Sequence, residues 1–395
     1  MVQTKGNRAW GHGDIPLRSG GARPYNLQMK DPRVEKLADV LIDYSLEIRE
    51  GDLFRINAST EAEPLIKELY RKALERGAHP LLRIGLPGLS EIFYKYASDA
   101  ELEYLSEIAM FEAERIDASL GIWSELNTRE LSGISPERIS KHRKAQAPLV
   151  KRYYERADSG EMRWCGTLFP TPSAAQEADM GTAEFEDFVF SACFADRPDP
   201  IAEWKAVQER QEKLRSALES LSEIRIETRE TDLRISVKGR KWENCCGKNN
   251  MPDGELFTSP VEDSANGVAY YPYPSLVGGR LVEGVRLEFK DGRVIGASAE
   301  RGEDYLLESL DLDEGARYLG ELAFGTNPGI QRITKNILFD EKIAGTMHMA
   351  LGKGFSKLGG KNFSILHWDM ILDMREGRVT ADGTVIYEDG EFRIG

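Results

Sequence analysis

Residues 29–221 alternate between two spacings of apolar side chains, one typical of helices and one typical of strands. Short strand-like runs are separated by longer stretches in which apolar residues recur every three or four positions. The expected helices span 31–48, 61–78, 135–157, 183–194 and 201–221, and the expected strands span 52–58, 79–85, 115–122 and 162–170. Strand, helix and strand in this order are typical of a parallel sheet, so the pattern predicts an α/β domain with a mainly parallel sheet flanked by helices.

Beyond residue 221 the apolar repeat shortens from about 3.6 residues to two. The segment 224–239 places Ile, Leu or Val at alternate positions, and an Asp-Gly pair inside 285–298 is typical of a hairpin turn. The segment 381–394 repeats the same signal, which favours a β-rich α+β domain. The expected organisation is a disordered arm or extension over 1–28, an α/β domain over 29–221 and a β-rich domain over 222–395.

Composition and charge are those of a globular protein, with 41% hydrophobic and 30% charged residues. A chain of 395 residues exceeds what one core usually supports, which agrees with two domains. No run approaches the roughly 18 apolar residues of a membrane helix, and the start of the chain lacks the apolar segment of a signal peptide, so we expect a cytoplasmic protein without a membrane partner. A net charge of −14, with no basic stripe, argues against nucleic acid as a partner.

Most cysteines and histidines give little functional signal. The cysteines show no C-x-x-C spacing and two are adjacent, so we expect reduced, mostly buried thiols. Three histidines lie in the arm, beside a strand start or on a charged helix face, where solvated or packing roles are typical. These residues are Cys165, Cys193, Cys245, Cys246, His12, His79 and His142.

The stretch ILHWDMILDM places a histidine and an aspartate two positions apart in an otherwise apolar run. In an extended strand His367 and Asp369 share one face, while Trp368 points the other way. Taken alone, the pair could be a hydrogen bond that only satisfies two buried polar groups. The same alternation places Ile365 and Ile371 on the face of the pair, as an apolar lining.

Three further polar residues of the same domain stand in apolar or glycine-bounded surroundings. They are His348 in IAGTMHMALGKGF, Glu321 in YLGELAFGTNPGI and Glu255 after a Pro-Asp-Gly turn. A charge in such surroundings needs a partner. Carboxylates and imidazoles without a thiolate suit Zn²⁺, Co²⁺, Mn²⁺ or Fe²⁺, so the set with His367 and Asp369 predicts a site for one or two divalent cations.

Asp340 and Glu341 precede His348 in ILFDEKIAGT. They could supply a further ligand or orient His348 by a hydrogen bond. Their neighbour Lys342 permits a plain surface ion pair instead, and both interpretations stay open at this point.

Five ordered blocks of the sequence resemble the M29 family of metalloaminopeptidases, of the aminopeptidase T type. The blocks are MPDGELFTSPVEDSANGVAYY, LGELAFGTNPGI, DEKIAGTMHMALGKGF, LGGKN and HWDMI, and the resemblance covers most of the chain from Met29 onward. It implies an α/β amino-terminal domain, a β-rich carboxy-terminal domain with a pair of divalent metal ions, and a homodimer that encloses the active sites. It also implies removal of amino-terminal residues from peptides. The positions that match the family's metal ligands are Glu255, Glu321, His348, His367 and Asp369.

One position departs from the family pattern. The family has a tyrosine seven residues after the histidine, and the resemblance implies a catalytic part for it, but this chain has Phe355. A phenylalanine can neither donate a hydrogen bond nor relay a proton. The enzyme could therefore be slower, Lys353 or Lys357 could supply the charge, or the scaffold could serve different chemistry.

The leading hypothesis is an enzyme, a metal-dependent aminopeptidase that acts on short peptides through a metal-activated water. Two divalent ions per subunit, with Zn, Co or Mn as candidates, would be bridged by Glu321, which would also carry the proton to the leaving amine. The resemblance leaves two competitors. Fe(II)-dependent ring-cleaving dioxygenases of dihydroxypyridines look similar and need His and carboxylate ligands, and a metal-binding dimer with reduced catalysis is the other alternative.

Overall fold

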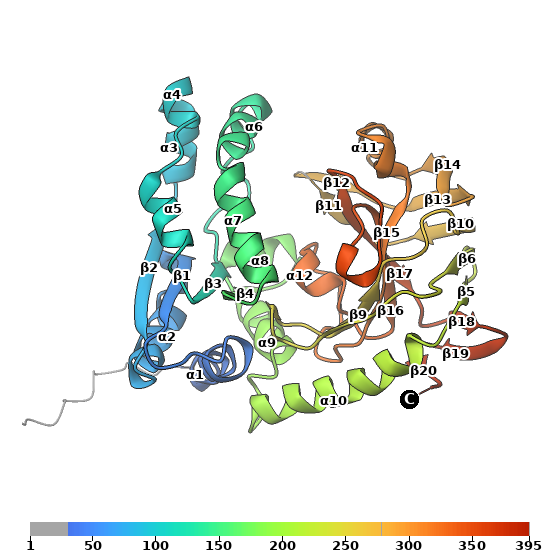
Figure 1. Cartoon of the computed structure of the whole chain (residues 1–395), viewed down its shortest axis with the longest axis horizontal. Coiled ribbons are helices and arrows are strands. Elements are labelled where there is room, and N and C mark those ends of the chain that lie inside the picture. The colour runs from blue at the N-terminus through green and yellow to red at the C-terminus, as the bar shows by residue number, and fades with distance from the viewer. Residues whose placement is uncertain (1–30, 278, 395) are drawn as a thin grey trace, which may run out of the picture. The chain divides into compact units, whose positions relative to one another are not determined.

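The computed structural model describes residues 31–277 and 279–394, and the predicted arm over 1–28 lies outside them (Figure 1). Among the described residues, no helix is both long enough and apolar enough to cross a membrane. Contacts within residues 32–395 group them as one unit. The predicted domain boundary near residue 221 stays a prediction.

The amino-terminal part is built on a parallel five-stranded sheet. Its strand order is β2-β1-β3-β4-β8, and every neighbouring pair runs parallel. The strands are β1 (Leu53–Ser59), β2 (His79–Gly85), β3 (Ala118–Trp123), β4 (Arg163–Leu168) and β8 (Asn250–Met251). The first four match the predicted strands closely. The last comes from the segment predicted to be β-rich, so the chain returns to this sheet after it has already contributed strands to the antiparallel sheets.

Helices connect and flank these strands. They are α1 (Pro32–Asp39), continued by the π-helical turn η1 (Val40–Ser45), α2 (Glu63–Glu75), α3 (Leu89–Tyr96), α4 (Asp99–Leu102), α5 (Glu107–Ala113), α6 (Pro136–Ala145), α7 (Ala147–Asp158), α8 (Pro172–Glu177), α9 (Thr182–Ala192) and α10 (Pro200–Leu218). The single helix predicted over 135–157 is wrong in one respect, because it is divided at Gln146. Pro148 lies in the first turn of α7, where its missing N–H is tolerated; within one continuous helix its ring would clash with an earlier carbonyl.

Two antiparallel sheets make up most of the remaining chain. The larger has the order β14-β13-β10-β6-β5-β18-β19-β20, and the smaller, which we call the site sheet, has the order β17-β16-β15-β9-β7. The larger sheet contains β5 (Glu223–Glu227), β6 (Asp232–Ser236), β10 (Asn266–Tyr271), β13 (Val285–Lys290), β14 (Arg293–Ser298), β18 (Arg378–Ala381), β19 (Thr384–Glu388) and β20 (Glu391–Phe392). The site sheet contains β7 (Glu243–Cys245), β9 (Glu255–Thr258), β15 (Leu319–Gly325), β16 (Thr346–Gly352) and β17 (His367–Asp373). A hairpin of β11 (Ser275–Val277) and β12 (Arg280–Val282) and the helices α11 (Glu303–Leu310) and α12 (Ile337–Asp340) complete this part.

One face of the site sheet is buried in a core shared with the larger sheet. Its side chains there are Leu256, Leu322, Phe324, Met347, Met349, Leu351, Trp368, Met370 and Leu372. The core continues into apolar residues of β5, β6, β13 and β18. Because side chains alternate along a strand, the intervening residues of β9, β15, β16 and β17 lie on the opposite face. That opposite face carries the candidate site.

Candidate metal centre

The five predicted ligands lie on four neighbouring strands of the site sheet. Glu255 begins β9, Glu321 lies on β15, His348 on β16, and His367 and Asp369 on β17. Four of the five are largely buried, with side-chain exposures of 7, 6, 1 and 11% for Glu255, Glu321, His348 and Asp369, whereas the His367 side chain is 33% exposed. The structure therefore brings together residues that are up to 114 positions apart in the chain, from Glu255 to Asp369.

Strand register aligns these residues and leaves space between them. Ala350 pairs with Glu321 on one side and with Asp369 on the other, and Ala323 pairs with His348. Paired residues in an antiparallel sheet point to the same face. Two methyl side chains therefore lie among the carboxylates and imidazoles, where larger ones would fill the space between them.

A β-bulge at Gly320 decides which way Glu321 points. Leu319 pairs with Leu351, but Glu321 pairs with Ala350, so β15 contains one extra residue at this point. Uninterrupted alternation from Leu319 would turn Glu321 toward the apolar core, and the extra residue turns it toward the site instead. Only glycine fits here, because a Cβ on Gly320 would lie 2.1 Å from the carbonyl oxygen of Lys353.

Glu321 occupies the middle of the cluster. Its Oε1 lies 3.5 Å from His348 Nε2, and its Oε2 lies 3.3 Å from His367 Nε2. Glu255 Oε2 approaches the same His348 nitrogen at 3.4 Å, and Asp369 Oδ2 lies 3.5 Å from His367 Nε2. The two oxygens of Glu321 therefore face different histidines, which is the arrangement expected of a carboxylate that bridges two ions.

The electrostatics of the cluster reflect its burial. Burial raises the pKa of Glu255 to about 8 and that of Asp369 to about 6. Burial would lower the pKa of His348, but the adjacent Glu321 and Glu255 carboxylates outweigh it and raise that pKa to about 10. Protons are thus held where cations would bind, and a metal ion entering the cluster would displace them.

The donor atoms fit a divalent metal. Glu255 Oε2, both ring nitrogens of His348 and Asp369 Oδ1 are buried and have no hydrogen-bond partner among the described residues. Buried polar atoms are normally paired, so these unpaired atoms indicate a missing ligand. Two groups, Glu255–Glu321–His348 and Glu321–His367–Asp369, each offer ligand atoms within 4.8 Å of one another, and Glu321 belongs to both.

Asp340 and Glu341 have different surroundings. Asp340 Oδ1 accepts hydrogen bonds from the backbone N–H and the hydroxyl of Thr334, at 2.7 and 2.8 Å, and among the described residues Asp340 forms no hydrogen bond or ion pair with His348. Glu341 offers an oxygen within 4.8 Å of ligand-type atoms of His348 and Asp369, so it adjoins the cluster directly.

Lys342 was not predicted from the sequence to be part of the site. The sequence allowed a surface ion pair here, but the Lys342 side chain is fully buried and its ammonium pairs with Glu341 and with Glu255. The signal available was weak. It consisted of a single lysine that lies three residues after Phe339 and directly before Ile343.

Phe355 lies beside the cluster. Its ring packs edge-on against His367, with ring centroids 5.5 Å apart, and against Phe257 at 5.0 Å. Of the lysines considered as replacements for a tyrosine hydroxyl, Lys353 is exposed, and Lys357 pairs with Glu243 at 3.2 Å. Among the described residues, neither ammonium forms a hydrogen bond or an ion pair with the five predicted ligands.

A cavity of about 210 Å³ opens beside the cluster. His367 and Asp369 form part of its wall, and α12 and the β11–β12 hairpin contribute further residues. Ile371 lines it as the alternation predicted, but Ile365 precedes β17 and is 72% exposed, so its predicted place in the lining is wrong. The cavity gives a small molecule direct access to two of the five predicted ligands.

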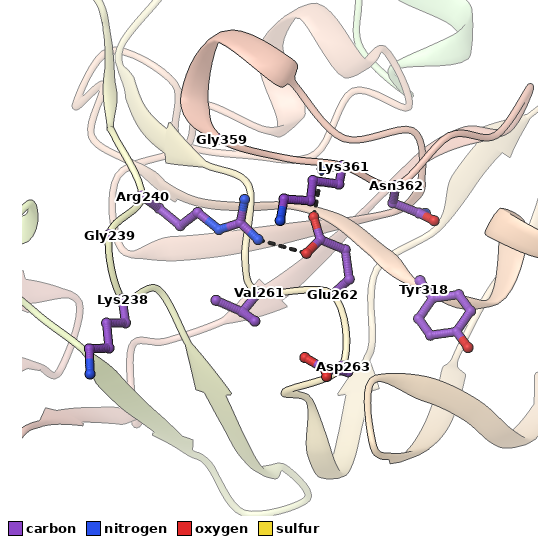
Figure 2. A pocket seen from close by; sticks show the side chains of 10 residues that line it. All are labelled: Lys238, Gly239, Arg240, Val261, Glu262, Asp263, Tyr318, Gly359, Lys361 and Asn362. Atoms are coloured by element: carbon purple, nitrogen blue, oxygen red, sulfur yellow. Dashed lines mark hydrogen bonds and ion pairs between the residues drawn. The ribbon is translucent and has the colours of Figure 1, made fainter.

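A larger pocket, of about 740 Å³, lies elsewhere and contains none of the five predicted ligands (Figure 2). Its charged groups largely satisfy one another. Glu262 accepts hydrogen bonds from the Arg240 guanidinium at 2.7 Å and from the Lys361 backbone N–H at 2.6 Å. We assign no chemistry to this pocket.

The remaining predictions for histidines and cysteines hold where the structure describes them. His142 packs against Phe93 and Tyr94, and its Nδ1 lies 3.0 Å from the Leu102 carbonyl oxygen. His79 is exposed at the start of β2, and His12 lies outside the described residues. All four cysteines are free thiols, and three of them are buried.

Comparison with known proteins identifies the family. The family model described as thermophilic metalloprotease (M29) matches residues 30–392. The chain belongs to the M29 family. Among M29-like relatives, aminopeptidase T of Thermus thermophilus is 30% identical over 90% of this chain and 95% of that protein, and aminopeptidase 2 of Geobacillus stearothermophilus is 29% identical over 89% and 95%.

Solved structures confirm the predicted fold class of this M29 chain. Wild-type AmpT from Thermus thermophilus superposes with a TM-score of 0.81 at 26% identity, covering 92% of this chain and 99% of that one. A 2,5-dihydroxypyridine dioxygenase from Pseudomonas putida KT2440 gives a TM-score of 0.55 at 13% identity over 92% and 98% of the two chains, which shows a shared fold alone. The matches therefore favour the predicted metallopeptidase over the dioxygenase.

Proposed function

We propose that this M29 protein is an aminopeptidase that removes amino-terminal residues from short peptides. The observation that carries the proposal is the convergence of Glu255, Glu321, His348, His367 and Asp369 on one face of the site sheet, with buried donor atoms left unpaired. The names of the relatives, aminopeptidase T and aminopeptidase 2, support peptide substrates.

Two divalent ions per subunit, with Zn²⁺, Co²⁺ or Mn²⁺ as candidates, fit the donor set best. Glu255, His348 and Glu321 would hold one, and Glu321, His367 and Asp369 the other. When bound, such ions supply positive charge that lowers the pKa of a nearby water toward neutrality and polarises the scissile carbonyl.

Glu321 carries the proton in this proposal. It accepts the proton of the attacking water on a carboxylate oxygen and delivers it to the leaving amine nitrogen, as general acid–base catalysis requires. Its Oε1 lies 3.5 Å from His348 Nε2 and its Oε2 lies 3.3 Å from His367 Nε2, so the carboxylate lies between the two nitrogens that would bind the ions. The cavity beside His367 and Asp369 would receive the end of the peptide.

Replacement of Glu321 by Gln tests the proposal. The change keeps the shape of the side chain and removes its charge and its capacity as a base, so cleavage of aminoacyl-p-nitroanilides should be abolished while circular dichroism stays unchanged. Glu308→Gln on α11, at an exposed position away from the site, is the control and should keep wild-type activity. Retained activity in Glu321→Gln would refute its role. A metal-loaded wild type that cleaves no peptide would point to a metal-binding dimer with reduced catalysis.

We also propose a homodimer in the cytoplasm. Apolar side chains exposed along β2, α3 and α5 support a second copy of this chain as partner. Four free thiols support a reducing compartment, because oxidising compartments favour disulfides.

A further inference from the structure

Lys342 is a buried cation at the edge of the candidate metal centre. Its side chain is fully buried, and its ammonium pairs with Glu341 and lies 3.7 Å from Glu255 Oε1. Burial of an ammonium is costly unless opposite charges compensate it. A buried lysine ammonium is therefore expected where neighbouring carboxylates compensate its charge.

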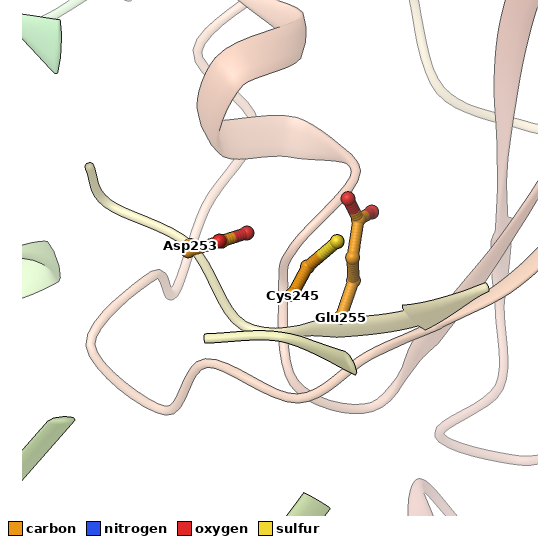
Figure 3. A group of neighbouring side chains, drawn as sticks. All are labelled: Cys245, Asp253 and Glu255. Atoms are coloured by element: carbon orange, nitrogen blue, oxygen red, sulfur yellow. The ribbon is translucent and has the colours of Figure 1, made fainter. Parts of the chain in front are cut away.

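A further group of ligand-type side chains surrounds the same carboxylate. Cys245, Asp253 and Glu255 each offer one atom, and these atoms lie within 4.8 Å of one another. Figure 3 shows the three side chains converging, with Cys245 and Glu255 side by side on paired strands and Asp253 on the segment before β9. Thiolate and carboxylate together form a donor set that suits Zn²⁺ or Co²⁺.

One atom of this group is unsatisfied. Asp253 is 2% exposed, and its Oδ2 accepts a hydrogen bond from the Gly247 backbone N–H at 2.8 Å. Its Oδ1 is buried and has no hydrogen-bond partner among the described residues. A buried carboxylate with one free oxygen, beside a thiol and a second carboxylate, is a site at which a cation would be stabilised.

Lys342 supplies that positive charge. Its ammonium interacts electrostatically with Asp253 as well as with Glu255 and Glu341. The two oxygens of Glu255 face different groups. Oε1 faces the Lys342 ammonium, and Oε2 lies 3.4 Å from His348 Nε2. Only one oxygen of Glu255 is thus left for the metal centre.

We propose that Lys342 is a built-in cation that closes a latent metal site formed by Cys245, Asp253 and Glu255. As a positioning residue, it keeps Glu255 Oε1 out of the metal centre and limits the number of ions that the cluster binds. The inference rests on the proposed function, because it presupposes a metal centre at Glu255. A further divalent ion close to the ammonium would be repelled by like charge, so the latent site stays closed while Lys342 is present.

Removal of the Lys342 ammonium should allow a divalent metal ion to bind at Cys245, Asp253 and Glu255. Metal-free Lys342→Ala, titrated with Co²⁺, should bind one more equivalent per chain than the wild type, measured by elemental analysis after desalting. A near-ultraviolet charge-transfer band from thiolate to cobalt should appear in this variant and be absent from the wild type. Lys342→Ala/Cys245→Ser should lose the band, which would assign it to Cys245.

Two control variants test whether the effect comes from loss of the positive charge at position 342 and not from loss of a lysine elsewhere. Lys342→Arg keeps a positive charge and should show neither the extra equivalent nor the band. Lys141→Met removes a lysine on α6 that pairs with Asp99 at 2.8 Å in the amino-terminal part, and it should behave as the wild type.

The outcomes distinguish this inference from the proposed function. A wild type that binds no Co²⁺ would refute the metal centre itself. A folded Lys342→Ala that binds the wild-type number of ions and shows no band would overturn the closed site. If Lys342→Ala is too unstable to purify, adding Asp253→Asn should restore folding by removing one uncompensated charge, and failure of that rescue would equally overturn it.

Discussion

Phe355 is the residue at which this chain departs from the pattern that its family resemblance implies. The ring lies against His367, with centroids 5.5 Å apart, so the position borders the candidate metal centre. No side-chain donor exists there, because phenylalanine carries no hydroxyl. Loss of one well-placed donor to a developing oxyanion typically costs on the order of 10² to 10³ in kcat.

Phe355→Tyr should therefore raise kcat. We expect an increase of up to about 10²-fold with KM little changed, because the new hydroxyl would act on the transition state more than on the bound substrate. Steady-state cleavage of aminoacyl-p-nitroanilides by the metal-loaded protein measures the effect. Phe363→Tyr, in the same loop but 80% exposed, is the matched control and should leave kcat unchanged. An unchanged kcat in Phe355→Tyr would mean that this position does not limit the reaction.

Strand β15 shows how an element controls the site. Its bulge inserts Gly320 between a core residue, Leu319, and the central carboxylate, Glu321. Simple alternation would place both side chains on the core face, but the extra residue keeps Leu319 in the core and turns Glu321 into the cluster. The bulge depends on close backbone contact with Gly352 at the end of β16 and with Lys353 in the loop that follows.

Gly320→Ala should disturb this element. The added Cβ would meet the Lys353 carbonyl oxygen at 2.1 Å, so β15 or the loop must move. We expect the free energy of unfolding to fall by about 1–3 kcal/mol, as is typical of overpacking, and metal affinity to fall with it as Glu321 shifts. Urea denaturation and metal titration measure the two effects. Gly121→Ala on β3, where a Cβ meets nothing within 4 Å, is the matched control; equal effects in both variants would contradict the argument.

At the scale of the whole molecule, exposed apolar side chains gather on consecutive elements of the amino-terminal part. Leu82 and Ile84 on β2, Ile92 on α3, and Ile108 and Phe111 on α5 are all exposed. These elements lie on the same side of the picture in Figure 1. Several exposed apolar side chains on elements of one region often mark an interface, which supports the proposed homodimer.

Ile92→Glu/Ile108→Glu should convert a dimer into a monomer. Two charges introduced into an apolar interface would lose their hydration on association, and this cost opposes dimer formation. Size-exclusion chromatography with light scattering measures the mass. Ile295→Glu on β14 is the control, because Ile295 is exposed to the same 53% as Ile92 but lies on the larger antiparallel sheet. A monomeric wild type, or a dimeric double variant, would contradict this interface.

Much of the architecture could be predicted because it depends on local spacing. Strands β1 to β4 of the parallel sheet and the hairpin at Asp291–Gly292 lie where the apolar pattern places them. Helices α3 to α5 were not predicted, and their apolar residues are largely exposed, so they lack the buried stripe that makes a helix recognisable in a sequence. The division of the helix at Gln146 depended on one proline, Pro148. In the sequence its position allowed either a kinked helix or the start of a second helix.

The sequence by itself determined the shared face of His367 and Asp369, because alternation along a single strand needs no information from elsewhere in the chain. It also identified, by family resemblance, the residues that the structure brings together. Only the tertiary structure decided the orientation of Glu321 and the burial of Lys342. Both depend on strand pairing and backbone contacts between segments that are distant in sequence, and such contacts leave no periodic signal in either segment alone.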